Sequence, residues 1–313
     1  MWKELARRFS PLSAGPRETI WSIGILLGVS PLDLRESNRF KNPVLTRADV
    51  TDVPALFVAD PFMIQVDGKW RMFFEVYNKA HRKGEIGCAV SANGIDWKYE
   101  GIVLAEPFHL SYPCVVDWAG DFYMIPESRD AGDVRLYRAS HFPDRWEYVA
   151  SLFHAPFADS TVFRFENRWW MFTDASPSYR LRYREPQLGY RHDTLRLFHA
   201  DQLTGPWREH PKSPIVHSDP HIARPGGRVF MGRTHLRFAQ DCYPIYGSRL
   251  FAFQITRLSP TCYEEIEIRE GPILAPGTAS WNRDGMHHID PHLLDDGNVI
   301  ACVDGFSWQL DER

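Results

Sequence analysis

Five stretches of the sequence repeat one pattern, and this repetition constrains the fold more than any other feature. Residues 59–75 (ADPFMIQVDGKWRMFFE) align without a gap on residues 111–127 (SYPCVVDWAGDFYMIPE). Residues 158–174 form a third copy, and weaker copies begin at Ser218 and Ile289. Because self-similarity at a fixed spacing is typical of repeat architectures, we expect five similar units. The units start near residues 60, 112, 159, 219 and 290.

Each unit has the pattern of a β-hairpin, and in the first four units a second pair of strand-like segments follows. Within the hairpin, two apolar runs flank a turn sequence, such as VDGK in the first unit, WAGD in the second or PGGR in the fourth. Four strands per unit, at a spacing of about 50 residues, are typical of a β-propeller blade. The sequence therefore predicts an all-β, five-bladed β-propeller that forms a single domain over residues 1–313, with residues 1–19 as a flexible N-terminus. The alternative is a β-sandwich whose hairpins resemble one another by accident.

The fifth unit runs to Arg313 without room for its two outer strands. Residues 18–34 (ETIWSIGILLGVSPLDL) resemble the outer pair of the third unit at residues 193–207 (DTLRLFHADQLTGPW). We therefore expect the N-terminal segment to complete the last blade and close the ring.

Acidic residues recur where the first strand of each unit begins and where the second strand ends. These two ends of a hairpin lie at the same edge, and the first strand of a propeller blade lies nearest the central axis. The ten positions are Asp60, Tyr112, Asp159, Asp219 and Asp290 in first strands, and Glu75, Glu127, Asp174, Thr234 and Asp304 in second strands. Eight of the ten are carboxylates, although strands disfavour acidic residues, so an acidic cluster at the mouth of the central channel is predicted.

Such a cluster can supply the acid and the base of glycosyl chemistry, because close like charges push carboxyl pKa values apart. The catalytic candidates are Asp60, Glu75, Glu127 and Asp159, and Asp174 is a substrate-binding candidate. Glu75 and Glu127 stand out because each ends an apolar strand without an evident local role. The alternative is that these residues satisfy backbone amides in turns at the blade edges, which suits Asp304 best.

Histidines form a second group of candidates. His109 precedes the second unit, His221 lies in DPHIARPGG, and His287 and His288 lie in HHIDPH. Imidazole and carboxylate suit zinc or manganese, so His221, His288 and Asp290 are candidate ligands for a divalent metal. Alternate residues of a strand point to opposite faces, however. This favours the alternative that the histidines, together with Asp290, hydrogen-bond a sugar or a neighbouring blade.

Further substrate-binding candidates are Tyr112, Trp170, Tyr179, Arg237, Gln240 and Asp241. Arg237 can clamp a carboxylate or phosphate of a ligand, because guanidinium binds such groups with two hydrogen bonds. A surface arginine with no ligand is the alternative. Trp170 and Tyr179 flank the third hairpin and are candidates for stacking on a sugar ring.

Charge and cysteine content limit the partners and the compartment. The net charge of −4 comes without a long basic run, so nucleic acid and anionic membrane surfaces are not expected partners. No apolar stretch is long enough for a transmembrane segment or a secretory signal. The five cysteines include no CxxC pair and are typical of buried thiols in a reducing compartment. We therefore expect a cytoplasmic protein.

A dozen short motifs, in order, resemble the N-terminal domain of the glucosamine inositolphosphorylceramide transferase family. They include VADPF, MFFE, GEIGCAVSANGIDW, HLSYP, YMIPES, RPGGR and HHID, and the resemblance runs from about Trp21 to Trp308. That domain is similar in turn to the five-bladed propellers of glycoside hydrolase family 43 and the arabinanase, levansucrase and invertase superfamily. Eukaryotic members carry a separate C-terminal glycosyltransferase domain, and this sequence stops at Arg313 before one. The transferase activity is therefore not carried over from the resemblance.

The resemblance also assigns roles at three positions. Family 43 enzymes are inverting and open their first three blades with a base Asp, a pKa-tuning Asp and an acid Glu. Asp60 matches the base, but Tyr112 and Asp159 stand at the other two positions. The resemblance thus implies either that Glu75 or Glu127 supplies the acid, or that the domain has kept sugar binding without hydrolysis.

Three functions are consistent with these observations. The first two are glycosidic-bond chemistry by a glycosidase-like or by a glycosyl-transferring enzyme, acting on an intracellular glycan or glycolipid intermediate. The third is a non-catalytic carbohydrate-binding partner of a glycosyltransferase in polysaccharide biosynthesis. The expected ligand is a sugar, glycan or sugar phosphate, and a divalent metal is the only cofactor suggested.

Overall fold

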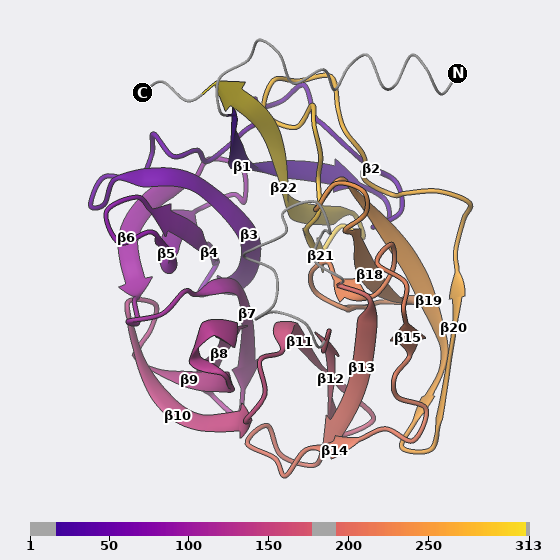
Figure 1. Ribbon diagram of the computed structural model, residues 1–313. Helices are drawn as coiled ribbons and strands as arrows, with labels where there is room; N and C mark the ends of the chain where they lie inside the picture. The colour runs from indigo at the N-terminus through magenta and orange to yellow at the C-terminus, as the bar shows by residue number, and fades with distance from the viewer. Residues whose placement is uncertain (1–16, 177–191, 311–313) are drawn as a thin grey trace.

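Five antiparallel sheets surround a common centre in the computed structural model, which describes residues 17–176 and 192–310 (Figure 1). The predicted all-β, five-bladed β-propeller is confirmed. Blade one contains β3 (Ala55–Val66), β4 (Lys69–Asn78), β5 (Lys83–Ser91) and β6 (Lys98–Leu104). Blade two contains β7 (Ser111–Trp118), β8 (Asp121–Glu127), β9 (Val134–His141) and β10 (Arg145–Phe153), with the 3-10 turn η2 (Arg129–Ala131) between β8 and β9.

The remaining three blades follow the same order with local irregularities. Blade three contains β11 (Ala158–Phe165), β12 (Arg168–Asp174), β13 (Thr194–Ala200), β14 (Arg208–Glu209) and β15 (Val216–His217). Blade four contains β16 (Arg224–Pro225), β17 (Phe230–Met231), β18 (His235–Asp241), β19 (Arg249–Ser259) and β20 (Cys262–Glu267). Blade five contains β21 (Ile289–Leu293), β22 (Val299–Leu310), β1 (Arg17–Gly28) and β2 (Leu34–Arg35).

Blade five combines the two ends of the described chain. β1 pairs antiparallel with β22 along its whole length, from Arg17 opposite Leu310 to Gly28 opposite Val299. Residues 17–19, which the sequence placed in a flexible N-terminus, are thus part of a strand. Residues 1–16 lie outside the described residues.

The strands of blade four lie at other residues than the sequence predicted. The sequence placed its first strand near residue 219 and its second strand before Thr234, with PGGR as the hairpin turn. In the structure β18 is the second strand, and Arg224 pairs with Gln240. The PGG sequence interrupts the first strand instead of turning it. Gly227, with φ +124°, approaches Ile289 of blade five so closely that a Cβ would lie 1.7 Å from the Ile289 carbonyl oxygen.

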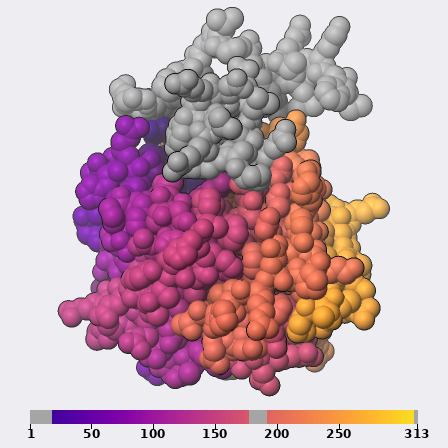
Figure 2. Space-filling view, turned by 60° about the horizontal axis from the view of Figure 1, so that its bottom comes forward, coloured from indigo at the N-terminus to yellow at the C-terminus, as the bar shows by residue number. Residues whose placement is uncertain are grey.

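Apolar side chains fill the spaces between neighbouring blades. Phe73 of blade one meets Trp146 of blade two edge to face, with ring centroids 5.4 Å apart. The four large apolar clusters each combine residues of adjacent blades. Because both faces of a blade are covered, inner strands are buried almost continuously, as in β12. Figure 2 shows consecutive blades abutting in chain order, from purple through magenta to orange.

No helix within the described ranges has the length and apolar character needed to cross a membrane.

This packing predicts that leucine-to-alanine substitutions at two positions differ greatly in their effect on the free energy of unfolding. Leu136, on β9, is fully buried between blades, whereas Leu293, at the end of β21, is 62% exposed. Leu136→Ala should lower the free energy of unfolding by about 2–5 kcal/mol, because it leaves a cavity, and Leu293→Ala by less than about 0.5 kcal/mol. Urea denaturation of the two variants measures this, and equal losses would contradict the packing described.

Candidate functional site

The first strands of blades one, two and three share a backbone distortion at one equivalent position. Asp60, Tyr112 and Asp159 have φ angles of 53°, 46° and 48°. Each lies at a register shift in the pairing between the first and second strands of its blade. A left-handed residue other than glycine is uncommon and costs about 1–2 kcal/mol, and a bulge redirects its side chain. All three side chains contact residues of other blades, so the distortion brings them to the centre of the ring.

Arg224, the first residue of β16, links blade four to blades two and three. Its Nε donates to Asp159 Oδ2 at 2.6 Å and its Nη2 to Asp159 Oδ1 at 3.1 Å. The same Nη2 donates to Glu127 Oε2 at 3.3 Å. Gln240 donates to Asp159 at 2.7 Å. Asp159 and Glu127 are thus neutralised by a cation buried among them, and Asp159 has no oxygen free of a hydrogen bond.

The other end of the Arg224 guanidinium meets His192. Arg224 Nη1 lies 3.1 and 2.9 Å from the two ring nitrogens of His192. His192 Nδ1 in turn lies 2.5 Å from Asp174 Oδ2, while Ser176 donates its backbone N–H to Asp174 Oδ1. Asp174 therefore has the local turn role that the sequence left open as an alternative, and it also orients His192.

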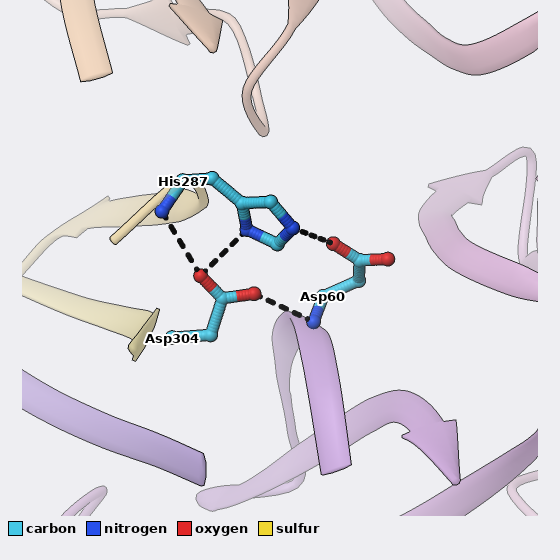
Figure 3. A group of neighbouring side chains, drawn as sticks. All are labelled: Asp60, His287 and Asp304. Atoms are coloured by element: carbon cyan, nitrogen blue, oxygen red, sulfur yellow. Dashed lines mark hydrogen bonds and ion pairs between the residues drawn. The ribbon is translucent and has the colours of Figure 1, made fainter. Parts of the chain in front are cut away.

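Asp60, His287 and Asp304 form a second connected group (Figure 3). Asp304 Oδ2 accepts the backbone N–H of Asp60 at 3.0 Å, and its Oδ1 lies 2.8 Å from His287 Nδ1. His287 Nε2 lies 3.8 Å from Asp60 Oδ1. All three residues are buried. Asp60 Oδ1 accepts no hydrogen bond from the described residues.

Glu75, which lies within β4 three residues before its end, is a second buried carboxyl without a close partner. Its Oε1 accepts no hydrogen bond from the described part of the chain, and His109 Nε2 lies 3.6 Å away. His109 Nδ1 accepts the Gly84 backbone N–H at 2.8 Å, so its ring proton is on Nε2 and faces Glu75.

Burial and neighbouring charge divide these carboxyls into two kinds. Burial raises the pKa of Asp60 to about 8, and His287 offsets only part of the effect. Burial, with the charges of Asp60 and Glu127, raises the pKa of Glu75 well above its usual range. Burial raises the pKa of Asp159 to about 6, against the opposing charge of Arg224. Asp60 and Glu75 therefore hold protons at neutral pH, whereas Asp159 is largely ionised.

The pKa values of Asp174 and Asp304 are lowered, because the effect of their histidine partners exceeds the opposite effect of burial. The hydrogen bond and charge of His192 lower the pKa of Asp174, and those of His287 lower the pKa of Asp304. Burial disfavours protonated His287, yet Asp304 and Asp60 raise its pKa. Ionised and protonated carboxyls thus lie side by side at the centre of the ring.

Several predicted substrate-binding residues have structural partners instead. Arg237 is buried, donates two hydrogen bonds to Glu265 at 2.8 and 2.6 Å, and donates a third to the Ile222 carbonyl. We therefore correct the expectation of an anion clamp at Arg237, because its guanidinium is already neutralised inside blade four. Trp170 is 1% exposed and packs between blades three and four, which leaves no face for stacking on a sugar.

Tyr112 and Asp290 hold blades together. The Tyr112 hydroxyl lies 2.7 Å from Thr161 Oγ1 and accepts the Gly227 N–H at 2.7 Å. Asp290 forms a buried ion pair with Arg228 and accepts the Met63 N–H at 2.5 Å. Tyr179 lies outside the described residues.

The three candidate metal ligands named from the sequence do not converge through any contact of the described residues. His221 lies at the surface and is paired with Asp241 at 2.9 Å, while Asp290 is paired with Arg228. His288 is fully buried near Asp60, and burial lowers its pKa to about 4, so its ring is neutral. A different set, Asp60, His287 and Asp304, offers ligand atoms within 4.8 Å of one another. Both oxygens of Asp304 already accept N–H donors, so this group is arranged as a hydrogen-bonded chain.

Sequence reasoning missed three residues of this centre: Arg224, His192 and Tyr246. Tyr246 lies in the β18–β19 loop, is 39% exposed, and has its ring centroid 5.1 Å from the Arg224 guanidinium carbon. Arg224 could have been found by pairing RP with AQ across blade four, but the PGG sequence indicated a turn. Nothing in the sequence relates His192 to Arg224, 32 residues away.

The fold is a five-bladed propeller similar to those of glycoside hydrolases. A thermostable family-43 glycoside hydrolase superposes with a TM-score of 0.61 at 16% identity, covering 87% of this chain and 94% of that one. A β-1,2-mannobiose phosphorylase from Listeria innocua superposes with a TM-score of 0.63 at 13% identity, covering 90% and 96%. At these identities the likeness concerns the fold.

The chain belongs to the family described as "Glucosamine inositolphosphorylceramide transferase 1, N-terminal", whose model matches residues 15–306. The transferase of that name from Oryza sativa subsp. japonica is 35% identical over 306 residues, covering 92% of this chain and 40% of the relative. The Arabidopsis thaliana protein of the same name is 34% identical, with 92% and 39% covered. The resemblance noted in the motifs is thus confirmed, and the chain spans about two fifths of the length of these relatives.

The raised pKa of Asp60 predicts a pH-dependent cost to stability. The value rises from 3.8 to about 8 on folding, so the folded state binds the extra proton and stability falls as pH rises from about 4 to about 8. Asp60→Asn removes this cost, and asparagine tolerates the left-handed backbone there. The variant should be more stable than the parent by about 1 kcal/mol or more at pH 8, with little gain at pH 4.

Chemical denaturation of both proteins between pH 4 and pH 8.5 measures this difference. A gain that does not depend on pH, or a loss at pH 8, would contradict a protonated Asp60 in the folded protein.

Proposed function

We propose that this domain performs glycosidic-bond chemistry at the mouth of its central channel, with Asp60 and Glu75 as the proton-transferring pair. One observation carries the proposal: Asp60 Oδ1 and Glu75 Oε1 are buried carboxyl oxygens without a hydrogen bond among the described residues. Leaving such atoms unsatisfied costs free energy, and a ligand that hydrogen-bonds them recovers it.

The two carboxyls would act in turn. Glu75 donates its proton to the glycosidic oxygen as the bond from that oxygen to the anomeric carbon breaks. Asp60, once ionised, accepts the proton of the incoming hydroxyl as its oxygen bonds to the same carbon. This assignment gives Asp60 the base role that the family-43 resemblance implies, and it selects Glu75 over Glu127 as the acid, because Arg224 occupies Glu127.

The surroundings of the pair fit a sugar. Asp159, Glu127 and Arg224 present charged acceptors and donors for hydroxyl groups, and the partly exposed ring of Tyr246 can stack on the apolar face of a pyranose. The names of the relatives include glucosamine and inositolphosphorylceramide. We therefore propose an amino sugar as the ligand, whose ammonium group the carboxyls favour, in an intracellular glycan or glycolipid intermediate.

A second function is favoured by a specific observation. Arg224 neutralises Asp159 and Glu127, which are two of the four catalytic candidates. A site with half its carboxyls occupied can hold a sugar without transforming it. The chain would then be the carbohydrate-binding partner of a glycosyltransferase.

The test is a screen for binding and turnover. The panel contains glucosamine, N-acetylglucosamine, aryl glycosides, a glucosaminyl inositol phosphate and sugar nucleotides, each with and without a divalent metal. We expect Asp60→Asn and Glu75→Gln each to lower turnover by about 100-fold or more, with folding retained. Asp117→Asn, an identical change at an exposed position, is the control and should leave turnover unchanged.

The outcomes separate the two functions. Turnover that depends on Asp60 and Glu75 supports the catalytic proposal. Binding that Glu75→Gln weakens, without turnover of any compound in the panel, supports the binding partner. Turnover that both substitutions leave intact would place the chemistry elsewhere in the molecule.

A further inference from the structure

Asp304 is fixed by four donors. Besides the Asp60 N–H and the His287 ring, it accepts the backbone N–H groups of His287 at 3.3 Å and His288 at 3.1 Å. Its side chain is fully buried. A carboxylate held in this way stays ionised and cannot move, so the proton between Asp304 and His287 resides on His287 Nδ1.

The His287 ring is held on its other sides. Trp21 stacks on it with centroids 4.0 Å apart, and Tyr246 meets it edge-on at 5.4 Å. The backbone of Gly247 packs against it as well, because a Cβ there would lie 2.7 Å from His287 Cδ2. With Nδ1 directed at Asp304, the second ring nitrogen faces Asp60 (Figure 3). Asp304 and Trp21 thus fix His287 as a neighbour of Asp60.

We propose that Asp304 and His287 form a proton-holding dyad for Asp60. The inference rests on the proposed function, in which Asp60 must be ionised to act as the base. The proton leaves Asp60 Oδ1 and binds His287 Nε2, and the resulting imidazolium is compensated by Asp304 on one side and the new Asp60 carboxylate on the other. No charge leaves the site. After the reaction Asp60 carries the proton of the incoming hydroxyl and Glu75 has lost its own, so the starting state is restored when the product departs, His287 releases its proton and Glu75 takes one up.

The distance between Asp60 and His287 is close to that required for proton transfer. The 3.8 Å between Asp60 Oδ1 and His287 Nε2 shortens to a hydrogen bond with a shift of about 1 Å. Arg224 acts against protonation of His287, and His288 adds no charge because it is neutral. Around Asp60, the charges of Asp159 and Asp304 favour the protonated carboxyl, and His287 and Arg224 favour the ionised one. His288 Nδ1 also lies 3.8 Å from Asp60 Oδ1, but burial lowers the pKa of His288 to about 4. Of the two histidines, only His287 has a hydrogen-bonded carboxylate, Asp304, to compensate the charge of a proton taken from Asp60.

The dyad predicts that removing His287 makes Asp60 harder to ionise. Carboxyl carbon NMR of protein labelled at aspartate Cγ, without ligand, gives the pKa of Asp60, assigned with Asp60→Asn. We expect His287→Gln to move the titration of Asp60 upward by about one pH unit or more. A structural role for His287 alone would not move it. An Asp60 pKa unchanged in folded His287→Gln overturns the proposal.

If His287→Gln does not fold, a reciprocal measurement on Asp60→Asn tests the dyad instead. Ring carbon NMR of histidines should show His287 titrating at lower pH in Asp60→Asn than in the parent, since one of its two facing carboxyls is gone. His221, paired with Asp241, is the internal control and should not shift. An unchanged His287 titration in this variant would overturn the dyad equally.

These readouts need no substrate, so they fail independently of the proposed function. If Asp60 and His287 titrate without influence on each other while Asp60→Asn abolishes turnover, the dyad is overturned and the proposed function stands. If they are coupled but the panel shows neither binding nor turnover, the proton-holding pair is supported and the proposed function fails.

Discussion

The ion pair between Arg224 and Asp159 allows an acidic centre to exist in this ring. Arg224 reaches from blade four to carboxyls of blades two and three and to His192. Breaking a buried pair by removing one partner typically costs about 3–5 kcal/mol, because the other charge is left uncompensated. Without this guanidinium, the negative charges of Asp159 and Glu127 would repel each other. The pair therefore fixes which carboxyls are ionised and which are not.

The centre then contains two populations of carboxyl with different tasks. Asp159, Asp174 and Asp304 each have a cationic or histidine partner and carry charge. Asp60 and Glu75 lack such a hydrogen-bonded partner among the described residues, and burial keeps them protonated. Active sites commonly separate carboxyl pKa values in this way, because acid and base are needed together at one pH. The left-handed backbone at Asp60 is a further cost that the rest of the fold must offset.

The sequence predicted the propeller because hairpins at a regular spacing leave few other solutions. It also placed Asp60 and Glu75 at the same edge, since the register of a two-stranded hairpin follows from its turn. It failed where a contact joins distant parts of the chain. Arg224 and Arg237 look alike in sequence, and only their partners, Asp159 in the centre and Glu265 inside blade four, distinguish a site residue from a packing residue. The PGG sequence was wrongly predicted to be a turn. Its actual role, a close approach to Ile289 in blade five, arises only when the ring closes and leaves no local signal in the sequence.

The central claim is that Asp60 and Glu75 hold protons near neutral pH while Asp304 and Asp174 do not. Neutron diffraction from crystals of the protein grown in heavy water near neutral pH observes this directly. We predict deuterium on one carboxyl oxygen of Asp60 and of Glu75, and none on Asp304 or Asp174. Bare carboxylates at both Asp60 and Glu75 would contradict the account.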